Sequence, residues 1–159
     1  MTAYGLPAIL KACELVRRRL SAMNRKELEL RIPADVRYLS LVRRGIRSMA
    51  ESMGFARPDV ADVEIAVSEA VTNSVQHGGC SADASTVVVR CTALDDYIVV
   101  EIEDESRAGL PPMVMPSAEC TDEHGRGILM MQALMDSFEG QQTPQGLRVR
   151  MGKHLAHQR

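Results

Sequence analysis

The sequence predicts an α/β (α+β) two-layer sandwich, in which helices cover one face of a mixed sheet. Short β-branched runs alternate along the chain with longer segments of helical periodicity. The 159 residues have the length of one domain, which buries about 70% of its unfolded surface. Tryptophan is absent and aromatic residues make up 3%, so the core must consist of aliphatic side chains and some of the ten methionines.

Residues 1–24 predict a helical extension that precedes a main domain over 25–159. Leu6 to Met23 carry apolar residues at helical spacing beside Arg17, Arg18 and Arg19. This helix could pack on the domain, dimerise, lie on a membrane surface, or be absent if translation begins at Met23. Three arginines in one turn more often make a solvated face.

The main domain opens with a predicted strand and a predicted helix. The strand covers 27–32, where ELELRI alternates, and Pro33 ends it. Asp35 suits the N-cap of a helix that reaches about Met53 and closes at Gly54. Its inward residues share a helical spacing: Leu39, Val42, Ile46 and Met49.

A second helix and a hairpin are expected next. Asp59 or Asp62 can cap the helix, which ends at residues 77–79, where glycine suits the C-cap. The β-branched runs at 86–92 and 97–103 are joined through two aspartates and predict a hairpin. The second of these strands delivers Asp104 at its end.

The last third predicts a loop, a helix and two short strands. Residues 107–123 contain three prolines and no clear period, and loops of this length are uncommon unless functional. The helix follows at 128–135, where Met130, Met131 and Met135 are expected in the core. Strands near 137–140 and 147–151 finish the sheet.

Two motifs carry candidate chemistry. The segment EIAVSEAVTNSVQHGG sets Glu69 and Asn73 one helical turn apart on an otherwise small and apolar helix. Leaving both side chains buried without partners would cost about 1–3 kcal/mol each, and a hydrated cation on phosphates would supply partners. The second motif is His124-Gly125-Arg126-Gly127 before the last helix. Glycines there allow close backbone approach, and free N–H groups attract anions.

Taken together, the motifs resemble the GHKL ATPase superfamily, and within it the serine kinases that act as anti-sigma factors. EAVTNSVQHG is similar to the N box of the family, VEIEDES to the strand that leads to its first glycine box, and HGRGILMMQALMD to its second glycine box. The resemblance covers about residues 27–151. It implies the GHKL (Bergerat) ATP-binding fold.

The resemblance also implies a role for each matching residue. Asn73 matches the residue that helps hold Mg²⁺ on the phosphates of ATP, and Glu69 matches the proposed general base for a serine hydroxyl. Asp104 matches the acceptor for the adenine amino group. Gly125 and Gly127 match glycines that border the phosphates. A further candidate is Arg126, placed to reach a phosphate oxygen. The last is His77, which lies one turn after Asn73: it could approach the pocket, or it could be there because the helix dipole favours a histidine near the C terminus.

The chain departs from the family pattern at two places. Where the first glycine box reads Asp-x-Gly, this chain has Asp104-Glu105-Ser106. Where the family has Gly-Thr-x-Val, this chain has Gly146-Leu147-Arg148-Val149. Both departures fall on the side that recognises the base, so we expect weaker nucleotide binding or slower turnover than in a typical member.

Composition restricts the partners and the compartment. A net charge of −2 and a pI near 6.1 argue against direct contact with nucleic acid. The four cysteines form no CxxC pair, and neither a signal pattern nor a membrane-spanning run is present. We therefore expect a soluble cytoplasmic protein with free thiols.

Three functions follow from the resemblance. The first is an ATP-dependent serine kinase that binds a sigma factor and phosphorylates an anti-anti-sigma (STAS-type) antagonist, acting as a homodimer. The second is a nucleotide-ordered module that sequesters a protein partner with little kinase activity. The third, a detached histidine-kinase catalytic domain, is disfavoured because the N-terminal helix is too short to supply a phosphoacceptor helix pair.

Overall fold

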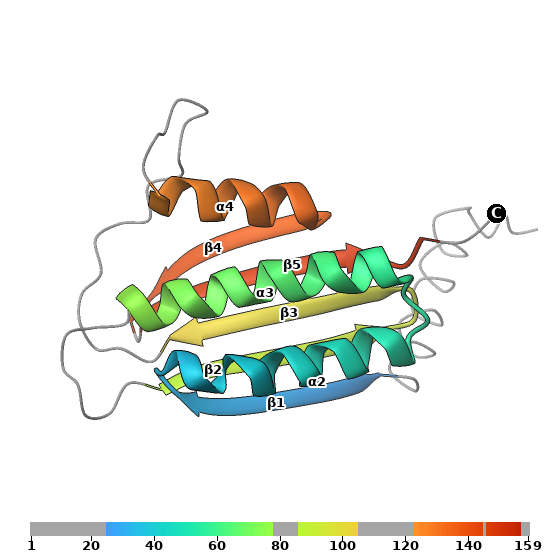
Figure 1. The fold of residues 1–159 in the computed structure, drawn as a ribbon, viewed down its shortest axis with the longest axis horizontal. Coiled ribbons are helices and arrows are strands. Elements are labelled where there is room, and N and C mark those ends of the chain that lie inside the picture. The colour runs from blue at the N-terminus through green and yellow to red at the C-terminus, as the bar shows by residue number, and fades with distance from the viewer. Residues whose placement is uncertain (1–24, 78–85, 105–122, 145, 157–159) are drawn as a thin grey trace, which may run out of the picture.

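The computed structural model describes residues 25–77, 86–104, 123–144 and 146–156, and in these ranges three α-helices cover one face of a five-stranded sheet (Figure 1). The elements in chain order are β1 (Lys26–Pro33), a 3₁₀ turn η1 (Val36–Tyr38), α2 (Leu39–Ser52), α3 (Arg57–His77), β2 (Thr86–Leu94), β3 (Tyr97–Asp104), α4 (Glu123–Leu134), β4 (Ser137–Thr143) and β5 (Gly146–His154). The predicted two-layer sandwich is confirmed. The predicted N-terminal helix and the loop 107–122 lie outside the described residues.

The sheet has the strand order β1-β2-β3-β5-β4, and its four described pairings are all antiparallel. The expectation of a mixed sheet was therefore wrong. The segment between β3 and β4 contains α4, and β4 then forms the edge of the sheet. Because the β4–β5 hairpin inserts β5 between β3 and β4, no parallel strands become neighbours.

The first helical segment lies where the sequence predicted it, but Asp35 does not cap α2. Asp35 accepts a hydrogen bond from the backbone N–H of Arg37 at 2.8 Å and so caps the 3₁₀ turn η1, while the N-cap residue of α2 is Tyr38, which makes no side-chain capping bond. The hydrogen bond from the Arg37 side chain, together with that backbone bond, lowers the pKa of Asp35. Gly54 has a φ of +87° where the helix ends, a conformation that glycine adopts without strain.

Helix boundaries correct two expectations. Helix α3 begins at Arg57, so Asp59 and Asp62 lie inside it and neither is its N-cap. Helix α4 begins at Glu123, so the paired glycines lie within its first turns rather than ahead of it. Proline at 58 stands near the start of α3, where its missing N–H is tolerated.

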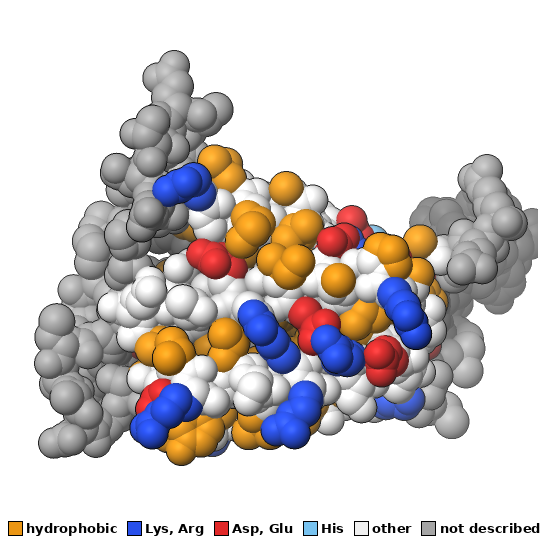
Figure 2. Space-filling model, in the orientation of Figure 1, with side chains coloured by type: hydrophobic (Ala, Val, Ile, Leu, Met, Phe, Trp, Pro, Cys, Tyr) orange, Lys and Arg blue, Asp and Glu red, His pale blue; other side chains and the backbone are white. Residues whose placement is uncertain are grey.

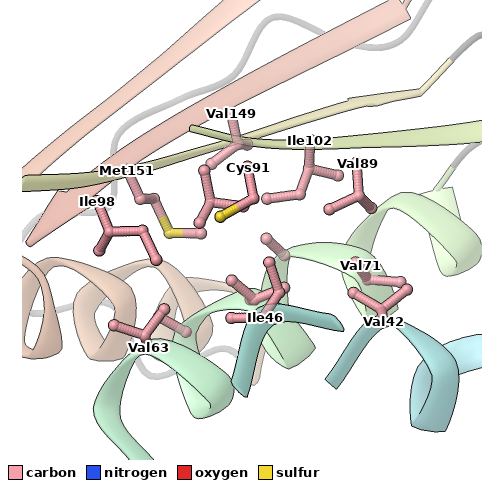
Figure 3. Packing of buried hydrophobic residues seen from close by; sticks show 14 of the residues in the cluster. Val42, Ile46, Val63, Val71, Val89, Cys91, Ile98, Ile102, Val149 and Met151 are labelled. Carbon is pink, nitrogen blue, oxygen red and sulfur yellow. The ribbon is translucent and has the colours of Figure 1, made fainter. Parts of the chain in front are cut away.

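The core lies between the helices and the sheet and is aliphatic. Figure 3 shows Val42, Ile46, Val63 and Val71 from the helices facing Val89, Cys91, Ile98, Ile102, Val149 and Met151 from the strands. Met131 and Met135 are buried as expected. Met130 is 39% exposed, so the prediction that it lies in the core was wrong. One residue is 100° of helical turn, which carries Met130 away from the face that Met131 buries.

The two surfaces of the sandwich differ in chemistry. Figure 2 shows hydrophobic side chains over α4, where Leu129 and Met130 are exposed, and basic side chains over α2. On the opposite face of the sheet, ion pairs cross four strands in a row. The row runs Glu29, Arg90, Glu103 and Arg148, with N···O distances of 2.9, 3.0 and 2.9 Å. No helix within the described ranges is long and apolar enough to cross a membrane.

Candidate functional site

Four parts of the fold come together at one edge of the molecule, at the left of Figure 1. They are the C-terminal half of α3, the start of α4, the end of β3 and the turn between β4 and β5. The candidate residues of both motifs lie on these elements. The sequence motifs are about 50 residues apart, so it is the fold that places them at a common edge.

Glu69 and Asn73 are partly exposed residues on a largely buried stretch of α3. Their apolar neighbours on the helix are buried in the core: Ala66, Val67, Ala70 and Val71. The buried hydroxyls of the helix are satisfied locally, since Ser68 donates to the Glu64 carbonyl and Ser74 to the Ala70 carbonyl. Within the described part of the chain, the side chains of Glu69 and Asn73 have no such partner.

Gly127 brings the start of α4 onto Glu69. Gly127 is buried, and a Cβ placed on it would lie 2.2 Å from Glu69 Oε1 and 2.9 Å from Glu69 Cδ. A carbon atom cannot approach that closely, so the carboxylate occupies the space that a side chain at 127 would take. The acid of the first motif and a glycine of the second are thus in direct contact.

Asp104 ends β3 as predicted, and it is 2% exposed. Side chains alternate between the two faces along β3, so Asp104 lies on the same face as Ile102. That is the face that packs against the helices. Gly146 packs against it from β5: a Cβ at 146 would lie 2.1 Å from the Asp104 carbonyl oxygen and 3.0 Å from Oδ1. The φ of Gly146 is +154°.

The sequence analysis did not assign the contact between Gly146 and Asp104. Gly146 was noted only as the start of a segment that departs from the family pattern. The turn before it is held by Thr143, whose hydroxyl accepts from the Gly146 N–H at 3.2 Å and donates to the Gly146 carbonyl at 3.1 Å. A glycine two residues after a proline was the available signal for a special backbone conformation.

The remaining candidates lie at the same edge of the molecule. Arg126 is exposed at the start of α4. The backbone of Gly125 belongs to the first turn of α4, and His77 is the last residue of α3. The side chain of His77 and the glycines after it lie outside the described part of the chain. Within the described ranges, no three His, Cys, Asp or Glu side chains are grouped to hold a metal ion.

The fold and the two sequence motifs together point to one class of protein. Residues 32–153 match the family model described as the histidine kinase-like ATPase domain, which covers most of the chain. The chain belongs to the histidine kinase-like ATPase domain family, and within it to the family of the RsbW serine-protein kinases, as its relatives show.

Several of these relatives are similar over nearly their whole length. The chain is 33% identical to the serine-protein kinase RsbW of Bacillus velezensis over 142 residues, which is 83% of this chain and 88% of the relative. It is 31% identical to the serine-protein kinase RsbW of Bacillus subtilis, over 86% of this chain and 90% of the relative.

Solved structures show the same fold. The RsbU and RsbW domains of a Mycobacterium tuberculosis protein match with a TM-score of 0.63 at 21% identity, over 82% of this chain and 32% of that one. The histidine kinase domain of a blue-light activated histidine kinase from Erythrobacter litoralis matches with a TM-score of 0.52 at 17% identity, over 80% of this chain and 63% of that one. The predicted family and fold are confirmed.

Proposed function

We propose that this protein is an ATP-dependent protein serine kinase whose active site lies where α3, α4, β3 and the β4–β5 turn meet. One observation carries this proposal. The carboxylate of Glu69 lies against the start of α4 at Gly127, one turn before Asn73 and without a partner among the described residues. The kinase names of the full-length relatives support the same activity.

The residues present fit a nucleotide with its magnesium. Gly127 and Gly146 let Glu69 and Asp104 pack against the backbone at this edge, and the N-terminal end of α4 offers backbone N–H groups to an anion. The amide oxygen of Asn73 suits Mg²⁺, a hard cation that takes oxygen ligands and keeps several waters. Mg²⁺ would neutralise charge on the phosphates, and Arg126 stands on the first turn of α4 to reach them.

In the proposed reaction the serine oxygen of the protein substrate attacks the γ-phosphorus of ATP. Glu69 accepts the hydroxyl proton, the bond between the γ-phosphorus and the β–γ bridging oxygen breaks, and ADP leaves. The base must lie within hydrogen-bond reach of that proton. Asp104 would accept a hydrogen bond from the adenine amino group at the far side of the nucleotide.

The motif resemblance extends the proposal to partners. We propose that the protein sequesters a sigma factor, phosphorylates a serine on an antagonist of the STAS type, and acts as a homodimer. Phosphorylation of the antagonist would then release it and leave the kinase available to the sigma factor. The sequestering module without kinase activity is the competing function, and the altered first glycine box is its sequence support.

Nucleotide binding is tested by thermal unfolding with Mg-ATP. At 100 times its Kd, ATP is expected to add about 2.7 kcal/mol, and each kcal/mol shifts the Tm of a chain of this length by about 2–4 °C. Asn73→Ala should abolish most of the Mg-dependent part of the shift. An unchanged Tm at saturating Mg-ATP in the original chain would reject the nucleotide site.

Phosphoryl transfer is tested with radiolabelled ATP and antagonist proteins encoded near the gene. Glu69→Ala should reduce transfer by about 10²–10⁴-fold while the thermal shift with ATP remains. Glu51→Ala is the matched control, because Glu51 is exposed near the end of α2 and away from the site. ATP binding without transfer to any candidate would favour the sequestering module, and full transfer by Glu69→Ala would remove the general base from the proposal.

A further inference from the structure

The contact between Glu69 and Gly127 joins the two halves of the proposed active site. The nearest atoms to a Cβ at 127 are Oε1, Cδ and Cγ of Glu69, at 2.2, 2.9 and 3.1 Å. Gly127 itself is buried, while Glu69 is partly exposed on α3. The outer half of the Glu69 side chain therefore fills the volume over the Cα of Gly127.

We propose that Gly127 is a positioning residue for Glu69, and that its missing side chain is what allows the carboxylate to stand where it can take the serine proton. This inference rests on the proposed function, which makes Glu69 the base. It differs from the role implied by the motif resemblance, in which this glycine borders the phosphates. In the structure, the carboxylate of Glu69 occupies the space that a side chain at 127 would take.

A side chain at 127 would displace the carboxylate rather than the helix. The backbone of Gly127 is fixed within α4, and Met131, one turn later, is buried in the core with 1% exposure. Glu69 is a flexible side chain whose end can rotate about several bonds into the partly open edge. Because the flexible partner gives way first, an alanine at 127 should move the base and leave the fold in place.

The expected signature separates positioning from structural support. Alanine is a better helix former than glycine, so Gly127→Ala should keep or raise stability. The proton of the serine hydroxyl would then lack a base within reach, and misplacing a reacting group by about 1 Å can cost on the order of 10²-fold in rate. A purely structural glycine would instead lose stability and activity together.

The experiment compares Gly127→Ala with Gly45→Ala in the full chain. Gly45 is the matched control, since it lies in α2 and a Cβ there would meet, of the residues described, only the side-chain ends of Leu28 and Leu30. Three quantities are measured: the single-turnover rate of phosphoryl transfer at saturating ATP, the Kd of ATP, and the Tm. Gly127→Ala should lose about 10- to 100-fold in rate, keep its Kd within about threefold, and keep its Tm within about 4 °C. Gly45→Ala should keep the rate.

A double variant with Glu69→Ala completes the test. If Gly127 acts through Glu69, the double variant should lose no more rate than Glu69→Ala alone, and Gly127→Ala should raise the Tm more when Glu69 is already alanine. Three results would overturn the inference: an unchanged rate in Gly127→Ala, a Kd that weakens as much as the rate falls, or rate losses that multiply in the double variant.

Failure of the proposed function gives a different pattern. Full transfer by Glu69→Ala alone removes the base assignment, whatever Gly127→Ala does. The Tm changes of the two single variants and the double variant at positions 69 and 127 are measured without phosphoryl transfer. Their departure from additivity therefore tests the contact even if the protein proves to be a sequestering module. Additive Tm changes would show that the contact does not shape the site.

Discussion

At the scale of single residues, each of the two acids assigned to the site lies against a glycine from the second half of the chain. Glu69 contacts Gly127, and Asp104 contacts Gly146. The sequence predicted both acids from their place in the motifs, and their roles remain predictions. It did not predict which glycine would meet which acid, because that pairing depends on how α4 and the β4–β5 hairpin pack against α3 and β3.

Gly146→Ala should be more damaging than Gly54→Ala. Both glycines have positive φ, at +154° and +87°, but a Cβ at 54 would meet no atom of the described part of the chain within 4 Å, whereas one at 146 would meet the Asp104 carbonyl oxygen at 2.1 Å. Gly54→Ala carries only the backbone cost, about 1–2 kcal/mol. Gly146→Ala should exceed this and also weaken ATP binding, since Asp104 would have to move. Urea unfolding with and without Mg-ATP measures both, and equal costs at the two positions would contradict the contact.

At the scale of elements, the sequence predicted each described strand and α-helix, with the strand bounds correct to within three residues. The alternation in β1 and the β-branched runs of β2 and β3 reflect a sheet with one face in the core, which is a local signal. Helix starts were less accurate. An aspartate near a helix start has the same sequence signature whether it caps the helix or, like Asp62, bonds a lysine from another element at 3.1 Å.

The ion pairs on the open face of the sheet predict how the stability of the protein depends on pH. Burial alone would raise the pKa of Glu103, but hydrogen bonds from Arg90 and Arg148 hold it below its usual value. A lowered folded pKa stabilises the protein above the unfolded pKa of about 4.3. That stability is lost as the pH falls through the folded pKa. Glu29 on the edge strand also has a lowered pKa, because Arg90 and Arg31 donate to it.

Glu103→Gln should therefore destabilise the protein at pH 7 by about 1–3 kcal/mol, because two charge-assisted hydrogen bonds weaken. The difference from the original chain should shrink as the pH falls below about 4.3. Glu27→Gln is the control: Glu27 is 59% exposed and pairs only with Arg25 among the described residues, so its effect should stay within about 1 kcal/mol. Urea unfolding at pH 7 and at acid pH measures both, and a difference that does not depend on pH would reject the network.

At the scale of the whole molecule, Lys153 joins the sheet to two helices at the end opposite the site. It is 9% exposed on β5, and its ammonium donates to Asp62 of α3 at 3.1 Å and to the Leu134 carbonyl at the end of α4 at 2.7 Å. A cation at a helix C-terminus is also favoured by the helix dipole. Helix α4 is thus held at both ends, by Lys153 at one and by the packing of Gly127 on Glu69 at the other.

Lys153→Met should destabilise the chain by about 1–3 kcal/mol, because a partly buried carbonyl and a carboxylate lose their donor. Lys26→Met is the control, since among the described residues the ammonium of Lys26 makes only a long, exposed contact to Ser52 at 3.4 Å, and it should change stability by no more than about 0.5 kcal/mol. Urea unfolding compares the two variants. Equal effects would show that the buried lysine adds nothing beyond a surface charge.

The buried thiol of Cys91 offers an independent measure of global unfolding. Burial raises its pKa to about 12, so little thiolate exists at neutral pH in the folded protein. Alkylation at this position, followed by mass spectrometry of its peptide, should stay slow until the core opens. It gives each variant above a check that the core is intact.

The sequence by itself determined the family and the order of helices and strands along the chain, because periodicity and motif spacing are properties of neighbouring residues. Which residues carry the chemistry is a prediction from the same motifs. Only the tertiary structure decided that all described strand pairs are antiparallel, that Met130 faces outward, and that Gly127 lies on Glu69 and Gly146 on Asp104. These features depend on contacts between segments far apart in the chain, and packing of the whole domain selects them.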